Sequence, residues 1–135
     1  MGLLIDSSAF IQLERGGRDV DTLTGAVDDQ HLAMASISAS EVAVGIHKAD
    51  SPERSARRQR FLDAILAQVD VEPFDIPVAY KHAEPWAHLS GAGQMIGAHD
   101  LIIAATALTL GFSLLTHNLR DFSRVPGLTV QPPAW

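Results

Sequence analysis

The chain has 135 residues, of which 47% are apolar and 19% charged, and its formal net charge is −6. This length predicts a single domain over residues 1–135, and the apolar share is sufficient for a packed core. Without cysteine, the chain has no disulfide, cysteine-ligated metal site or cysteine nucleophile. The composition fits a cytoplasmic protein. The apolar run at 101–115 is shorter than a membrane span, and we expect no membrane partner.

The first half of the chain predicts two short strands, each followed by helices. A buried strand at 3–6 precedes a helix at 9–14, for which Ser7 and Ser8 offer an N-cap. We expect a second helix at 20–27 and a strand at 31–36. The following helix contains Ser38 and Glu41 at capping-box spacing. Ser51 and the adjacent proline predict the start of a helix that runs to about residue 69.

The second half repeats this alternation. It predicts a strand at 71–74, a helix from Pro77 that Pro85 should kink or break, and an apolar helix from Asp100 to Gly111. Strands at 112–116 and 128–131 flank a turn that contains Asn118 and Asp121. Strands that alternate with helices of crossover length predict an α/β fold: a three-layer sandwich with a short, mostly parallel sheet covered by helices.

Four acidic residues lie where the chain leaves a strand or enters the next helix: Asp6, Glu41, Asp100 and Asp121. Parallel strands present their carboxyl ends at one edge of the sheet, so these side chains could converge there. Clustered carboxylates repel one another unless a cation neutralises them, and oxygen ligands favour Mg²⁺ or Mn²⁺. A pair of such ions can drive phosphodiester hydrolysis, which makes a nuclease the natural interpretation.

Each acid also has a purely structural interpretation. Asp100 could be a charge favoured by a helix N-terminus, Glu41 could complete a capping box, and Asp121 could be a turn residue. Asp6 is harder to explain structurally, because an unpaired carboxylate at the end of an apolar strand is costly to bury.

Four sequence blocks resemble the PIN-domain ribonucleases, and most closely the VapC-type toxins of toxin–antitoxin pairs. The blocks are LLIDSSAFI at 3–11, ISASEVAVGI at 37–46, GAHDLIIAATAL at 97–108 and LLTHNLRDF at 114–122. The resemblance implies a PIN-like fold and an Mg²⁺- or Mn²⁺-dependent endoribonuclease that a cognate antitoxin holds inactive. It also implies a homodimer and products that carry a 5′-phosphate.

The resemblance also assigns roles to individual residues. The four acids of the family map onto Asp6, Glu41, Asp100 and Asp121, as catalytic residues and metal ligands. We expect Asp6, Asp100 and Asp121 to bind the metal directly, and Glu41 to bind a second ion or orient water. The supporting polar residues map onto Ser7 or Ser8, and onto Thr116 and Asn118.

A basic segment at 48–60 stands out in this acidic chain, with five basic and two acidic residues. Arg54, Arg57 and Arg58 recur at helical spacing and would share one helix face. They are candidates for RNA phosphate contacts, although a solvated face is the more common role of such residues. Arg15 and Arg120 are lesser candidates.

Two other classes of function compete with the nuclease. A receiver-type signalling module is also α/β, rich in acids and able to bind Mg²⁺, but it needs an acidic pair after the first strand and a lysine after a late strand. This chain has only Asp6 in that first loop. An interaction protein with a degraded site is disfavoured because all four acids are present.

Overall fold

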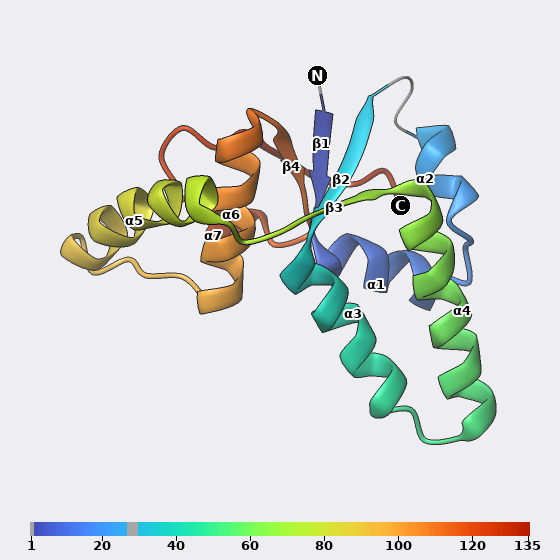
Figure 1. Cartoon of the computed structure of the whole chain (residues 1–135). Helices are drawn as coiled ribbons and strands as arrows, with labels where there is room; N and C mark the ends of the chain where they lie inside the picture. Colours follow the sequence, from blue (N-terminus) through green and yellow to red (C-terminus); the bar gives the residue numbers. More distant parts are fainter. Residues whose placement is uncertain (1, 27–29) are drawn as a thin grey trace.

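A computed structural model of the chain describes residues 2–26 and 30–135. Its centre is a five-stranded sheet in the order β3-β2-β1-β4-β5, and every neighbouring pair is parallel (Figure 1). The strands are β1 (Gly2–Ile5), β2 (His31–Ala35), β3 (Asp70–Glu72), β4 (Ser113–Leu115) and β5 (Val130–Gln131). The predicted parallel α/β sandwich is confirmed.

The helices form the two outer layers. They are α1 (Ser7–Arg15), α2 (Asp21–Ala26), α3 (Ser36–His47), α4 (Pro52–Gln68), α5 (Ile76–Gly91), α6 (Ala98–Leu110) and α7 (Leu119–Phe122). Helices α3 and α4 pack against each other and project beyond the sheet, whereas α5 packs on α6 at the opposite side of the molecule (Figure 1).

The alternation of side chains along β1 explains the three layers. Leu3 and Ile5 join a core with Phe10 of α1, whereas Leu4 joins a second core with Ile103 of α6. All five side chains are at most 1% exposed. Successive residues of a strand point to opposite faces, so this apolar strand requires a helical cover on both sides.

Most predicted elements are present, with shifted ends. Helix α1 already begins at Ser7, so Asp6 occupies the N-cap position and neither serine is a cap. Helix α6 begins two residues before Asp100, and a left-handed glycine, Gly111 with φ 70°, ends it as expected. The predicted turn at Asn118 and Asp121 contains the short helix α7. The helix predicted at 20–27 is observed to residue 26, and its last position lies outside the described residues.

One local prediction was wrong, and the break that Pro85 could have caused in α5 is absent. Helix α3 begins at Ser36 after Ala35, so Ser38 lies inside its first turn and does not form a capping box with Glu41. Helix α5 continues through Pro85 to Gly91 instead of breaking. A proline removes one backbone hydrogen bond, and here Pro85 is buried in a helix that packs along α6, so the packing holds the helix together.

Within the described part of the chain, no helix is both long enough and apolar enough to cross a bilayer.

The glycine at the start of β1 provides a test of this packing. A Cβ atom added at Gly2 would collide with the ring of Phe112, which itself packs edge-on against His31 at 5.3 Å. We expect Gly2→Ala to lower the free energy of unfolding by about 1–3 kcal/mol through overpacking. Urea denaturation should show a smaller loss when Gly2→Ala is introduced into a Phe112→Leu background. Equal losses in the two backgrounds would contradict the proposed collision.

Candidate functional site

Asp6 is held at the end of β1 by two hydroxyl groups. Its side chain is 3% exposed, and its Oδ2 accepts hydrogen bonds from Ser8 Oγ at 2.7 Å and Thr116 Oγ1 at 2.8 Å. Its Oδ1 accepts no hydrogen bond from any described residue. The two donors come from α1 and from the end of the neighbouring strand β4, so the parallel pairing of β1 and β4 sets the orientation of this carboxylate.

Asn118 extends this network to two further carboxylates. Its backbone N–H donates to Thr116 Oγ1 at 2.9 Å, which connects it to Asp6 through that threonine. Its side-chain amide lies 3.4 Å from Asp100 Oδ2 and 3.3 Å from Asp121 Oδ2. One amide nitrogen therefore bridges a carboxylate on α6 and a carboxylate on α7.

Glu41 reaches the same region from α3. Ser7 Oγ donates to its Oε1 at 3.1 Å, and His99 Nδ1 lies 3.6 Å from its Oε2. The carboxylate thus faces across to α1 and α6 instead of capping its own helix. The two consecutive serines contact different acids: Ser7 donates to Glu41, and Ser8 donates to Asp6.

The pKa of Asp100 shows that the four acids share one electrostatic environment. Burial of the carboxyl group and repulsion from Asp6, Glu41 and Asp121 raise this pKa from 3.8 to about 6, while His99 acts in the opposite direction. Because the neighbours act through their charge, a cation placed among them would relieve the repulsion.

The chemistry of these side chains suits a hard divalent cation. The site offers carboxylate oxygens from the end of β1 and from α3, α6 and α7, and the amide of Asn118 before α7. Such oxygens are ligands typical of Mg²⁺ and Mn²⁺. In the described part of the chain, however, no three acidic or histidine side chains are drawn together into a complete metal cage. A bound ion would therefore have to pull these carboxylates closer together.

Two contacts at this edge, and one buried hydroxyl group of α3, were not settled from sequence. The sequence offered Ser7 or Ser8 as the supporting residue; Ser8 binds Asp6, which the helical register of α1 could have indicated once its start was known. His99 faces Glu41 across two helices, and local sequence carries no signal for such a pair. Ser38 Oγ is fully buried and has no hydrogen-bond partner among the described residues.

The three arginines predicted to contact RNA do not form one free patch. Arg54 pairs with Asp50 at 2.9 Å. Arg58 donates to the carbonyl of Gly45 at 2.5 Å and lies 3.8 Å from Glu14 Oε1. Arg57 is exposed. Arg58 therefore links α4 to α3 and α1, whereas the Arg54 pair is local to the start of α4. The role of the three arginines in RNA binding stays a prediction.

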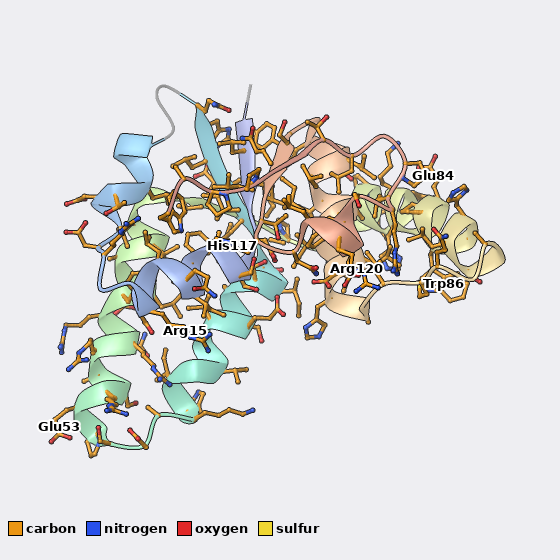
Figure 2. All side chains as sticks on the ribbon, turned by 180° about the vertical axis from the view of Figure 1, so that it is seen from behind. Arg15, Glu53, Glu84, Trp86, His117 and Arg120 are labelled. Carbon is orange, nitrogen blue, oxygen red and sulfur yellow. The ribbon has the colours of Figure 1, made fainter. Side chains whose placement is uncertain are left out.

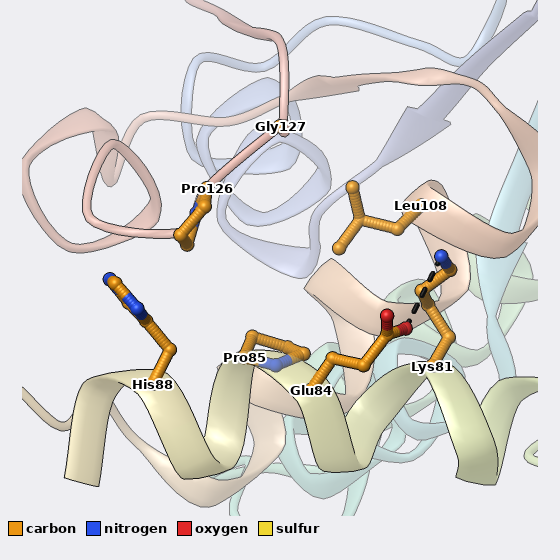
Figure 3. A pocket seen from close by; sticks show the side chains of 7 residues that line it. All are labelled: Lys81, Glu84, Pro85, His88, Leu108, Pro126 and Gly127. Carbon is orange, nitrogen blue, oxygen red and sulfur yellow. Dashed lines mark ion pairs between the residues drawn. The ribbon is translucent and has the colours of Figure 1, made fainter. Parts of the chain in front are cut away.

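A cavity of about 360 Å³ lies away from the carboxylates, between α5, α6 and the turn at Gly127 (Figure 3). The charged residues in its wall, Lys81 and Glu84, pair with each other at 3.2 Å. None of the predicted site residues lines it. Its charges are satisfied internally, and it offers no cluster of carboxylates that could hold a cation.

The raised pKa of Asp100 has a consequence for stability. A carboxyl group with a higher pKa in the folded state binds more protons there than in the unfolded state, so its contribution to stability falls as the pH rises from about 4 to 6. In EDTA at pH 7, Asp100→Asn should stabilise the fold by roughly 1 kcal/mol after allowance for solvent screening. Melting curves at pH 4 should show a much smaller gain, and an equal gain at both pH values would refute the repulsion.

The Thr116 hydroxyl connects Asp6 to Asn118, and its removal should be costly. Thr116→Val keeps the shape of the side chain but leaves Asp6 with one hydroxyl donor, and we expect a loss of about 1–3 kcal/mol in unfolding free energy. Thr106→Val is the matched control, because Thr106 is also buried but donates only to the Ile102 carbonyl within its own helix. Urea denaturation measures the free energy of unfolding of both variants. Equal losses would show that the hydrogen bond to Asp6 stabilises the fold no more than the one within α6.

Known proteins resemble this chain along nearly its whole length. Residues 3–128 match the PIN domain family. The chain is 36% identical over 133 residues to "Ribonuclease VapC1" of Rickettsia felis, covering 96% of this chain and 95% of that protein. It is 35% identical over 130 residues to "Ribonuclease VapC" of Rickettsia bellii, with the same coverage.

Solved structures also resemble this chain along nearly its whole length. A structure of VapBC-1 from nontypeable Haemophilus influenzae matches with a TM-score of 0.81 and 25% identity over 98% of both chains. The toxin–antitoxin complex VapBC-5 from Mycobacterium tuberculosis matches with a TM-score of 0.74 and 26% identity, over 98% of this chain and 96% of that one. With its parallel sheet and its acids gathered at one edge, this chain belongs to the PIN-domain family, among the relatives of the VapC ribonucleases.

Proposed function

We propose that the chain is a divalent-metal-dependent endoribonuclease that acts as the toxin of a type II toxin–antitoxin module. The observation that supports this proposal most strongly is the coupling of Asp100 to Asp6, Glu41 and Asp121 at one edge of the sheet. The names of the relatives support the ribonuclease activity, and the VapBC complexes support a cognate antitoxin as partner. We place the activity in the cytoplasm, where RNA is available.

The residues have distinct roles in this proposal. Asp6, Asp100 and Asp121 would bind Mg²⁺ or Mn²⁺, and Glu41 would bind a second ion or orient the attacking water. When bound, the metal supplies an activated water and stabilises the leaving oxygen of the phosphodiester. Thr116, Asn118 and Ser7 position these carboxylates through the hydrogen bonds they donate to them or to one another.

The protonation state of Asp100 sets a lower limit on the working pH. With a pKa of about 6, this carboxyl group is largely protonated in mildly acidic solution and cannot then bind a cation. Metal binding should therefore strengthen as the pH rises through about 6, and cleavage should follow the same trend.

The receiver-type alternative finds no support in the structure. Asp6 is the only acid in the connection that follows β1, and the lysines Lys48 and Lys81 lie at the end of α3 and within α5, not after a late strand. A homodimer, which the sequence resemblance implies, stays a prediction.

RNA cleavage by purified protein tests the proposal. The wild type should cleave a single-stranded RNA with Mg²⁺ or Mn²⁺ and lose this activity in EDTA. Asp121→Asn should reduce cleavage to background, because it removes a charge the cation needs. Asp63→Asn, on exposed α4, is the matched control and should cleave normally.

A binding readout separates the metal from the chemistry. A cation that binds only the folded state should stabilise the wild type by about 2.7 kcal/mol at a hundredfold excess over Kd, and Asp121→Asn should show a smaller effect. Identical melting curves in EDTA and in excess Mn²⁺, together with cleavage that does not depend on metal, would refute the metal site.

A further inference from the structure

The turn that ends α1 brings two arginines to one place. Gly17 adopts a left-handed conformation with φ 69°; its N–H donates to the Glu14 carbonyl at 2.9 Å, and the N–H of Arg18 donates to the Leu13 carbonyl at 3.1 Å. This pair of bonds is the Schellman arrangement, which reverses the chain at a helix C-terminus. Arg18 thereby returns beside Arg15, the last residue of the helix.

Arg15 and Arg18 line a cavity of about 330 Å³ together with Gln12, Gly16 and Trp135. The indole of Trp135 is fixed in place, because its Nε1 donates to the Ala9 carbonyl at 2.9 Å and its ring packs against the core beneath α1. The cavity thus combines two cations with a flat, anchored aromatic wall.

This cavity and the carboxylate site lie at different points along α1. Ser8, which binds Asp6, lies four residues before Gln12 and seven before Arg15, so the three share one helix face over about 10 Å. Arg15 also lines a second cavity, of about 140 Å³, whose wall includes Glu41 and Arg58. Figure 2 shows Arg15 pointing from α1 toward the space between α3 and α4.

The two arginines are available to a ligand. Both are exposed, and neither forms an ion pair with any residue that the structure describes. Glu14, which lines the second cavity with Arg15, lies 3.8 Å from Arg58 Nε. In a chain of net charge −6, two unpaired arginines beside a cavity favour an anionic ligand there.

We infer that Arg15 and Arg18 bind the sugar-phosphate backbone of the RNA strand next to the scissile phosphate, and that the Trp135 indole stacks with a neighbouring base. This inference rests on the proposed nuclease function and names a second contact region for its substrate. Arginine binds phosphate through two parallel hydrogen bonds, and aromatic faces accept any base, so the subsite would not depend on sequence. RNA fits better than an acidic protein segment because Arg15 also lines the second cavity beside Glu41, one of the carboxylates that would cut the strand.

The test measures RNA binding without cleavage. The Asp100→Asn protein binds a fluorescein-labelled, mixed-sequence single-stranded RNA, and affinity is recorded at several salt concentrations. Adding Arg15→Gln and Arg18→Gln should lower the affinity severalfold and flatten the dependence of log affinity on log salt by about 0.7 for each phosphate that the variant no longer binds. Adding Lys48→Gln and Lys81→Gln removes the same charge outside the two cavities and should leave the salt dependence unchanged. Melting temperatures verify that both variants fold.

The outcomes separate this inference from the proposed function. If the wild type cleaves RNA with metal but the Arg15→Gln, Arg18→Gln variant keeps the full salt dependence, the subsite is wrong and the nuclease stands. Loss of antitoxin binding with unchanged RNA binding would likewise overturn the inference, and it would assign the cavity beside Arg15 and Arg18 to the protein partner. If the arginine and lysine substitutions lower RNA affinity and its salt dependence equally, overall charge explains the binding, and the subsite is again wrong. If the wild type neither binds nor cleaves RNA, the subsite and the proposed function both fall.

Discussion

Repulsion among four carboxylates at one edge of the sheet is the constraint on which the site depends. The carboxylates come from the end of β1 and from three helices, and the fold holds them within range of one another although their charges oppose it. Thr116 and Asn118 make this possible, because their hydroxyl and amide groups give the carboxylates hydrogen-bond donors in place of water. The destabilisation that remains is the free energy that a bound cation would recover.

The parallel sheet supplies the rigidity that this arrangement needs. Ile5 pairs with Leu115, so Asp6 and Thr116 leave adjacent strands side by side. Buried side chains on both faces of β1 and β4 fix the two strands, and the bond between the Asp6 N–H and the Leu115 carbonyl at 2.9 Å extends the pairing by one residue. A threonine hydroxyl 110 residues away in the chain is thereby held against a buried acid.

Helix α1 relates the site to the rest of the surface. Its first residues hold the carboxylates, its middle packs on the core through Phe10 and Leu13, and its last turn presents Arg15 beside the indole of Trp135. A single rigid element therefore fixes the distance between the acids and the cationic cavity. The helix begins directly after Asp6, with the two serines in its first turn, and two glycines, Gly16 and Gly17, follow its last residue.

The sequence by itself determined the order of strands and helices, the parallel sheet and the four acids, because apolar periodicity, turn residues and short motifs are local signals. It did not determine the start of α3, the continuity of α5 through Pro85, or which serine binds which acid. Those depend on packing between distant elements, as does the hydrogen bond from Arg58 to the Gly45 carbonyl. Only the tertiary structure brings Thr116 to Asp6 and Arg18 to Trp135, because these contacts join residues that no local pattern connects.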